Sequence, residues 1–116
     1  MISSRTIRDF LDDIRSAAVK AQGFVSGMDY DTFAADEKTA YAVVRALEII
    51  GEATKRVPEE VRQKQLDIPW RSMSGLRDKL IHDYISVDLE VVWKTVHEDL
   101  PGLIVGIERM IQQQTT

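Results

Sequence analysis

The sequence of 116 residues contains no cysteine, so no disulfide can stabilise its fold. It also lacks an apolar leader region and any run of about 18 apolar residues that would cross a membrane. These absences predict a cytoplasmic protein that neither enters the secretory pathway nor spans a bilayer. With 44% hydrophobic and 29% charged residues, we expect one globular domain over residues 1–116.

An excess of basic residues is missing as well. The net charge is -4 and the pI is near 5.1, whereas nucleic-acid-binding proteins usually carry a basic face. The charge is uneven, however, because residues 55–79 are locally basic. This stretch holds Lys55, Arg56, Arg62, Lys64, Arg71, Arg77 and Lys79 against Glu59, Glu60, Asp67 and Asp78. A dimer could merge two such patches into one.

The sequence shows no sustained alternation of polar and apolar residues, which a half-buried strand would need. Apolar residues instead recur at a spacing of three and four, which is typical of amphipathic helices. We therefore predict an all-α fold, an up-and-down bundle of four to five helices with one short accessory helix. A helical protein of this size often completes its core by dimerising, so we expect a homodimer.

Capping residues and prolines predict the helix boundaries. The first helix should start after Ser3 or Ser4 and stop near Gly27. A turn-rich stretch at 28–31 precedes a second, more apolar helix that starts at Asp36. The short accessory helix covers 58–62, and a longer one runs from Trp70 through Ile81. The last helix follows a capping loop at 86–88, and Pro101 with Gly102 should kink or break it.

Arg77, His82 and Tyr84 lie within eight residues of one another. The guanidinium offers a planar fork of donors suited to a phosphodiester, and an imidazole exchanges a proton near neutral pH. For metal-free RNA cleavage His82 could act as general base, general acid or both, while Arg77 stabilises the charged transition state. Asp78 precedes His82 by four residues, the spacing at which a carboxylate can hydrogen-bond the imidazole and fix its tautomer.

A single straight helix cannot aim these three side chains at one point. Arg77 and Tyr84 would share a face, whereas His82 would point about 140° away from Arg77. Either the helix ends near His82 and turns the imidazole back, or the partner's copy completes the site across a two-fold axis. Both arrangements predict a cleft at a helix end.

These residues also have simpler interpretations. An arginine and a histidine at this spacing occur in many helical proteins as a solvated side chain and a helix C-terminal residue, and Tyr84 would then be a boundary aromatic. Glu48 and Glu52 fit a half-exposed polar seam better than a catalytic pair, and Gly51 fits close helix packing. His97 is typical of a surface helix end. The sequence has no metal-ligand spacing, so we predict no metal and no cofactor.

Several stretches together make the motif specific. Residues 41–53, 57–60, 68–71, 76–84 and 87–93 closely resemble the HepT-like ribonuclease toxins of the HEPN superfamily, and the resemblance spans nearly the whole chain. The family's pattern of Arg, four residues, His, any residue and Tyr matches Arg77, His82 and Tyr84 without gaps. Asp78 occupies the polar position that follows the family's arginine.

The resemblance implies an all-helical homodimer whose two motifs face a cleft at the interface, and a metal-independent endoribonuclease activity. It also implies the toxin of a type II toxin-antitoxin pair, whose antitoxin is a minimal nucleotidyltransferase. That partner would transfer AMP from ATP to Tyr84 and so neutralise the toxin, and a higher oligomer with the antitoxin stays open. Asp83 departs from the small or amide residue of many relatives, and its carboxylate either repels RNA or stabilises protonated His82.

Two other functions stay open at this point. The chain could be a non-catalytic dimeric helical module that binds a nucleotidyltransferase and is modified by it, which the acidic net charge and Asp83 favour. It could also be a nucleotide-binding helical domain in which Arg77 holds a phosphate without breaking it.

Overall fold

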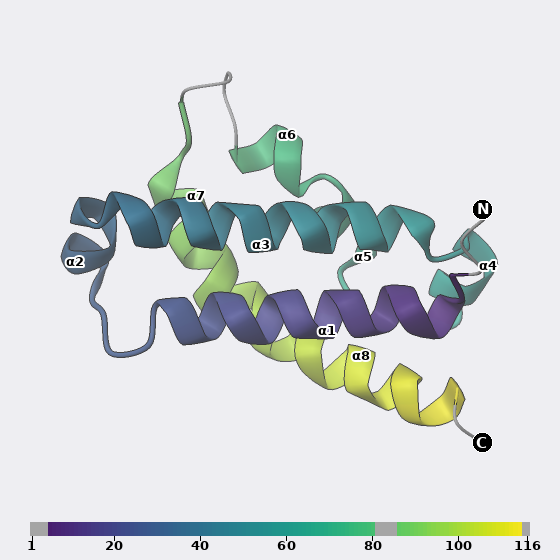
Figure 1. The fold of residues 1–116 in the computed structure, drawn as a ribbon. Coiled ribbons are helices and arrows are strands. Elements are labelled where there is room, and N and C mark those ends of the chain that lie inside the picture. Colours follow the sequence, from purple (N-terminus) through teal and green to yellow (C-terminus); the bar gives the residue numbers. More distant parts are fainter. Residues whose placement is uncertain (1–4, 81–85, 115–116) are drawn as a thin grey trace.

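The computed structural model describes residues 5–80 and 86–114. Two long helices, α1 (Ile7–Phe24) and α3 (Glu37–Arg56), run antiparallel and pack against each other along most of their length (Figure 1). A continuous helical path made of α7 (Leu89–Lys94), η1 (Thr95–Asp99) and α8 (Leu100–Gln114) crosses behind this pair. In that path α7 contacts α3 and α8 contacts α1.

Short helices connect these long segments. α2 (Tyr30–Ala35) links α1 to α3, and α4 (Glu59–Arg62), α5 (Trp70–Ser74) and α6 (Leu76–Leu80) lie between α3 and α7. Every regular element in the described part of the chain is a helix, which confirms the predicted all-α class. The predicted layout differs, because several short helices, and not one accessory helix, join the long ones. The homodimer stays a prediction.

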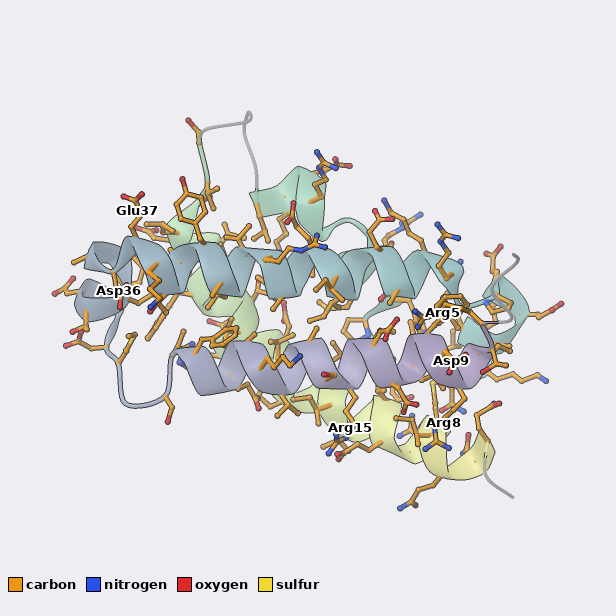
Figure 2. All side chains as sticks on the ribbon, in the orientation of Figure 1. Arg5, Arg8, Asp9, Arg15, Asp36 and Glu37 are labelled. Carbon is orange, nitrogen blue, oxygen red and sulfur yellow. The ribbon has the colours of Figure 1, made fainter. Side chains whose placement is uncertain are left out.

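The start of α1 is set by Thr6 and not by a serine. The Thr6 hydroxyl accepts a hydrogen bond from the Asp9 backbone N–H (3.2 Å), and the Asp9 carboxylate accepts one from the Thr6 N–H (2.8 Å). This reciprocal capping box lowers the pKa of Asp9 below its ordinary value (Figure 2 labels Asp9 at this end of α1). The prediction of Ser3 or Ser4 as the cap is therefore wrong; both lie outside the described residues.

The stretch predicted as a turn at 28–31 opens a helix. The Asp29 carboxylate accepts a hydrogen bond from the Thr32 N–H (2.8 Å) and caps α2. Asp36 caps α3 as predicted, accepting from the Thr39 N–H (3.1 Å), and Figure 2 labels it at the start of that helix. α1 stops close to the predicted Gly27, whose positive φ of 78° favours glycine in the turn.

The structure differs from the predicted helix boundaries at Gly75 and at Pro101. The helix predicted from Trp70 onward is divided at Gly75, whose N–H bonds back to the carbonyls of Arg71 and Met73 and ends α5. Glycine disfavours a helix interior, which explains the division. Of the kink or break predicted at Pro101 and Gly102, the break does not occur, because α8 continues through both residues. The π-helical turn η1 precedes Pro101 and changes the hydrogen-bond register where proline has no N–H to donate.

The core lies where α1, α3 and α8 meet, and the short helices add to it. Its large, fully buried side chains include Leu11, Ile14, Phe33, Leu47, Ile50, Met73, Leu76, Leu80, Leu100, Leu103 and Ile107. Within residues 5–80 and 86–114, no helix has the length and apolar character needed to cross a membrane.

Candidate functional site

The helix α6 carries the first part of the predicted motif. Its first and last residues, Leu76 and Leu80, are fully buried, and α6 packs against α3 and α7. The three residues between them, Arg77, Asp78 and Lys79, are exposed. A five-residue helix anchored by both ends therefore presents its charged middle to solvent.

Close packing beneath α6 depends on Gly51 of α3. A Cβ added at Gly51 would lie 3.1 Å from the Met73 carbonyl oxygen and 4.0 Å from the Leu76 Cβ. A Cβ rarely comes so near to a backbone oxygen, and the carbonyl has little freedom to move. The predicted role of Gly51 in close helix approach is confirmed. It brings the junction between α5 and α6 down onto α3.

Arg77 and Asp78 are both free of partners in the part of the chain that the structure describes. Neither side chain forms an ion pair or hydrogen bond with a residue in the ranges 5–80 and 86–114. A guanidinium that is exposed and not neutralised by a carboxylate is available to an anionic ligand. The predicted role of Arg77 in stabilising the transition state stays a prediction.

The other motif residues lie outside the described residues. His82, Asp83 and Tyr84 fall within 81–85. Their convergence with Arg77 and the predicted contact between Asp78 and His82 remain predictions.

The described residues on either side of that stretch meet. The Asp88 backbone N–H donates to the Leu80 carbonyl oxygen at 2.8 Å, joining the end of α6 to the residue that caps α7. The Asp88 side chain accepts a hydrogen bond from the Val91 N–H (3.2 Å), which starts α7. The fold thus holds Leu80, within the motif sequence, next to Asp88, four residues beyond its last residue.

The locally basic stretch 55–79 does not form one patch around Arg77. Its residues belong to the end of α3, to α4, to α5 and to α6. In Figure 1 α4 lies beside the C-terminal end of α3, whereas α6 lies along the middle of that helix. The positive charge of this stretch is therefore spread along α3.

An aromatic cluster between α2 and the end of α7 was not anticipated from the sequence. The Trp93 ring packs against Tyr30 (5.9 Å between centroids) and Phe33 (5.2 Å), which joins α2 to α7. Partial burial raises the pKa of the Tyr30 hydroxyl above its ordinary value, and the carboxylates of Glu90, Asp88 and Asp31 raise it further. The sequence shows that these aromatic residues are present, but it does not show their contact, because the contact joins distant parts of the chain.

His97 lies at the edge of this cluster, on the surface, as predicted. Its ring lies 4.0 Å from the Trp93 ring between centroids, and its Nδ1 is 2.9 Å from the Trp93 carbonyl oxygen. These contacts fully explain its position by local packing. They give it no role in the chemistry of α6.

The carboxylates of α3 also behave as the sequence indicated. Glu48 is 3.8 Å from Arg45, and Glu52 is 3.6 Å from Lys55. These loose surface pairs fit the half-exposed polar seam. No group of three or more potential metal ligands is found among residues 5–80 and 86–114.

Comparison with known proteins gives consistent matches. The model of the family described as ribonuclease HepT-like matches residues 14–110. "Probable ribonuclease HepT" of Thermococcus cleftensis is 45% identical over 106 residues, which cover 91% of this chain and 96% of that protein. A "Putative RNase" of Methanocaldococcus jannaschii is 41% identical over 108 residues, 93% of each chain. Another protein so named, from Caldanaerobacter subterraneus, is 36% identical over 110 residues, 95% of this chain and 98% of its own. No solved structure matches the chain.

Proposed function

This chain belongs to the HepT-like ribonuclease family, and from this premise we propose that it is a metal-independent endoribonuclease, the toxin of a type II toxin-antitoxin pair. The observation that carries the proposal is the ungapped motif of Arg77, His82 and Tyr84 in a chain that aligns almost throughout with proteins named as ribonucleases. The exposed, unneutralised guanidinium of Arg77 in the described part of the chain supports it.

The proposed reaction is attack of an RNA 2′-hydroxyl on the adjacent phosphodiester. The bond from O2′ to phosphorus forms and the bond from phosphorus to O5′ breaks, which leaves a 2′,3′-cyclic phosphate and a 5′-hydroxyl. His82 takes the 2′ proton or protonates the leaving O5′, and Arg77 stabilises the charge that gathers on the phosphoryl oxygens. Asp78 would hold the imidazole of His82 in one tautomer.

A homodimer would supply both proton transfers. One His82 would act as base and its copy in the second subunit as acid, with both motifs facing one cleft. This arrangement also resolves the geometric difficulty that one straight helix cannot direct Arg77 and His82 to the same phosphate. Dimers could pair further when the antitoxin binds.

Tyr84 is the proposed site of neutralisation. A nucleotidyltransferase antitoxin would transfer AMP from ATP to the Tyr84 hydroxyl, releasing pyrophosphate. The added group brings volume and negative charge next to His82, where an RNA phosphate must bind, and offers Arg77 an internal anion. The modified site would therefore exclude its substrate.

Expression in cells tests this proposal. The unmodified chain alone should arrest growth, and His82→Ala should not. Co-expression with a nucleotidyltransferase encoded beside the gene should restore growth and add the mass of one or more AMP groups, located on Tyr84. Protection should fail for Tyr84→Phe, which lacks the acceptor oxygen.

The net charge of -4 favours one alternative, a non-catalytic dimeric module that binds the nucleotidyltransferase and is modified by it. In that case both the wild-type chain and His82→Ala are harmless to cells, RNA stays intact with the purified protein in EDTA, and Tyr84 still gains AMP.

A further inference from the structure

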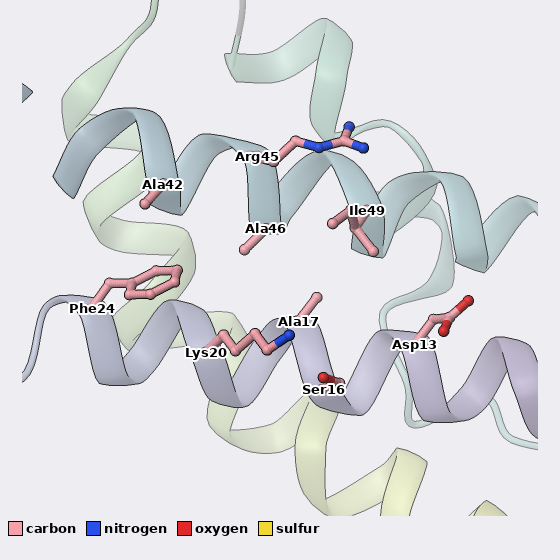
Figure 3. A pocket seen from close by; sticks show the side chains of 9 residues that line it. All are labelled: Asp13, Ser16, Ala17, Lys20, Phe24, Ala42, Arg45, Ala46 and Ile49. Atoms are coloured by element: carbon pink, nitrogen blue, oxygen red, sulfur yellow. The ribbon is translucent and has the colours of Figure 1, made fainter. Parts of the chain in front are cut away.

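A groove runs between α1 and α3 on the face of the pair that is turned away from α8 (Figure 3). It consists of two adjoining hollows of about 420 and 510 Å³. Both hollows are lined by Asp13, Arg45 and Ile49, so they form one continuous depression along the helices. Nothing in the proposed cleavage chemistry uses this surface.

The floor of the groove is made of small side chains. Ala17 of α1 lies across from Ala46 of α3, and Ala42 lies further along α3 towards Phe24, so a flat group can approach both helices closely. The Phe24 ring stands at one end of this floor and is 42% exposed (Figure 3). An exposed aromatic ring above a smooth apolar floor is suited to stack on a planar ring system.

The acidic side chains of the groove are already paired. The lining carries Asp13 and Glu52 against the basic residues Arg5, Lys20, Arg45 and Arg56. Asp13 forms an ion pair with Arg5, and Glu52 lies 3.6 Å from Lys55, which does not line the groove. Neither acid neutralises the other three cations.

Those three cations remain available. Lys20 and Arg56 form no ion pair with any residue in the described ranges. The Arg45 side chain is 71% exposed, and its contact with Glu48 is a long 3.8 Å. An acidic protein therefore presents positive charge from both walls of an apolar groove, unpaired at Lys20 and Arg56 in the described ranges and only loosely paired at Arg45. This combination complements a ligand that carries phosphates and flat rings together.

Resting on the proposed ribonuclease function, we propose that this groove binds a single strand of the RNA substrate. A base packs on the alanine floor and against Phe24, while the phosphates lie at Lys20, Arg45 and Arg56. Sites for single-stranded nucleic acids combine a cationic groove with aromatic stacking in this way. Arg45 and Arg56 are about 16 Å apart along α3, so they contact different phosphates. α3 also packs against α6, so a strand in the groove lies on a helix that supports the element carrying Arg77.

Binding is tested with a short fluorescein-labelled single-stranded RNA and the His82→Ala protein, which leaves the RNA uncut. Fluorescence anisotropy is measured over a salt series. Adding Lys20→Gln, Arg45→Gln and Arg56→Gln together should lower the slope of log affinity against log salt by about 2, since each phosphate contact on a single strand contributes roughly 0.7. Thermal unfolding of each variant checks that the fold is kept.

The matched control is Lys38→Gln, Lys64→Gln and Lys94→Gln in the same background. It removes the same charge from exposed residues outside the groove, and should keep the slope of the parent. If both sets of substitutions weaken RNA binding equally, binding depends on net charge alone and the proposal that the groove binds RNA is overturned. Unchanged binding by the groove variant would overturn it as well.

Phe24 tests the stacking contact separately. Phe24→Leu keeps an apolar side chain without a ring and should weaken RNA binding about tenfold, whereas Phe24→Tyr should bind as the parent does. Equal affinity of all three proteins contradicts a stacked base.

Cleavage and assembly separate failure of the groove from failure of the proposed function. With His82 intact, the groove variant should raise KM and leave kcat unchanged. If the groove variant cuts RNA with an unchanged KM, only the proposal that the groove binds RNA is overturned. If the wild-type protein never cuts RNA but the groove variant alone loses RNA binding, the groove proposal is supported and the ribonuclease proposal is overturned. If the groove variant turns a dimer into monomers in light scattering, a second copy covers this face and the RNA assignment falls.

Discussion

Apart from Lys20, the charged side chains on α1 are paired or hydrogen-bonded within the fold, whereas those presented by α6 have no partner among the described residues. Arg8 pairs with Asp12 at 3.2 Å, and Arg15 reaches Glu108 of α8 at 2.7 Å. Arg77 and Asp78 have no such partner in the described residues. Exposed pairs add little to stability, but a charge without a partner is free to meet a ligand. The difference separates a supporting frame from a candidate site.

The two helices also differ in what makes them helical. α1 has 18 residues, a capping box and a continuous apolar face. α6 has five residues, too few to be stable alone, so its conformation depends on packing against α3 and α7. The site is thus carried by an element that the frame must hold in place.

The largest expected effect comes from removing a side chain that anchors α6 to the rest of the fold. Leu76→Ala removes a fully buried anchor of α6 and should lower the free energy of unfolding by about 2 to 5 kcal/mol. Leu76→Met keeps the volume and should cost less than about 1.5 kcal/mol. Urea unfolding measures both. Equal stability of the two variants would mean that α6 does not rest on Leu76.

The next substitution should change the exposed guanidinium of Arg77 without disturbing the packing of α6 beneath it. Arg77→Lys keeps a positive charge but loses the fork of donors, and should reduce the rate of RNA cleavage about 10²- to 10³-fold. Its unfolding free energy should stay within about 0.5 kcal/mol of wild type. Lys79→Gln, on the same exposed part of α6, is the control and should keep the rate. A comparable loss in both would point to general surface charge.

A smaller effect comes from replacing two glycines by alanine, which should change the free energy of unfolding in opposite directions. Gly51→Ala places a Cβ 3.1 Å from the Met73 carbonyl oxygen and should destabilise the fold by about 1 to 3 kcal/mol. Gly102→Ala meets nothing within 4 Å in α8 and should stabilise it by up to about 1 kcal/mol, because alanine favours a helix. Denaturant unfolding of both proteins measures the two signs. Stabilisation by Gly51→Ala would show that α5 and α6 have room to move.

The smallest effect concerns the frame and its dependence on pH. Hydrogen bonds from Thr39 lower the pKa of Asp36 from 3.8. Its contribution to stability is therefore complete above the unfolded pKa and is lost as pH falls through the lower folded pKa. Asp36→Asn can still cap α3 but does not titrate. The difference in Tm between wild type and Asp36→Asn should shrink from pH 6 to pH 3, and a constant difference would contradict the capping account.

The sequence predicts the frame well because its signals are local. Periodic apolar residues define α1 and α3, and the carboxylate of Asp36 caps α3 where it was expected. The α1 cap was assigned too early because serine, threonine and aspartate are similar caps, and only the reciprocal bonds of Thr6 and Asp9 distinguish them. The π-helical turn before Pro101 was not predictable from periodicity, since it is a local response to a missing N–H.

The sequence predicts which residues form the candidate site better than it predicts their arrangement in space. Arg77 was singled out by its motif, and the structure shows it exposed on α6. The division of the helix at Gly75 and the spread of the basic stretch along α3 depend on tertiary packing, which residue spacing does not contain. The groove between α1 and α3 was missed for the same reason, because its residues come from two helices.

The central claim is that His82 performs proton transfer in RNA cleavage, and the chain offers a matched control in its other histidine. Single-turnover cleavage of a labelled RNA in EDTA should be about 10²- to 10⁴-fold slower for His82→Ala than for wild type. His97→Ala, which alters a surface ring stacked on Trp93, should cleave at the wild-type rate. Wild-type cleavage by His82→Ala, or no cleavage by any of the three proteins, would contradict the account.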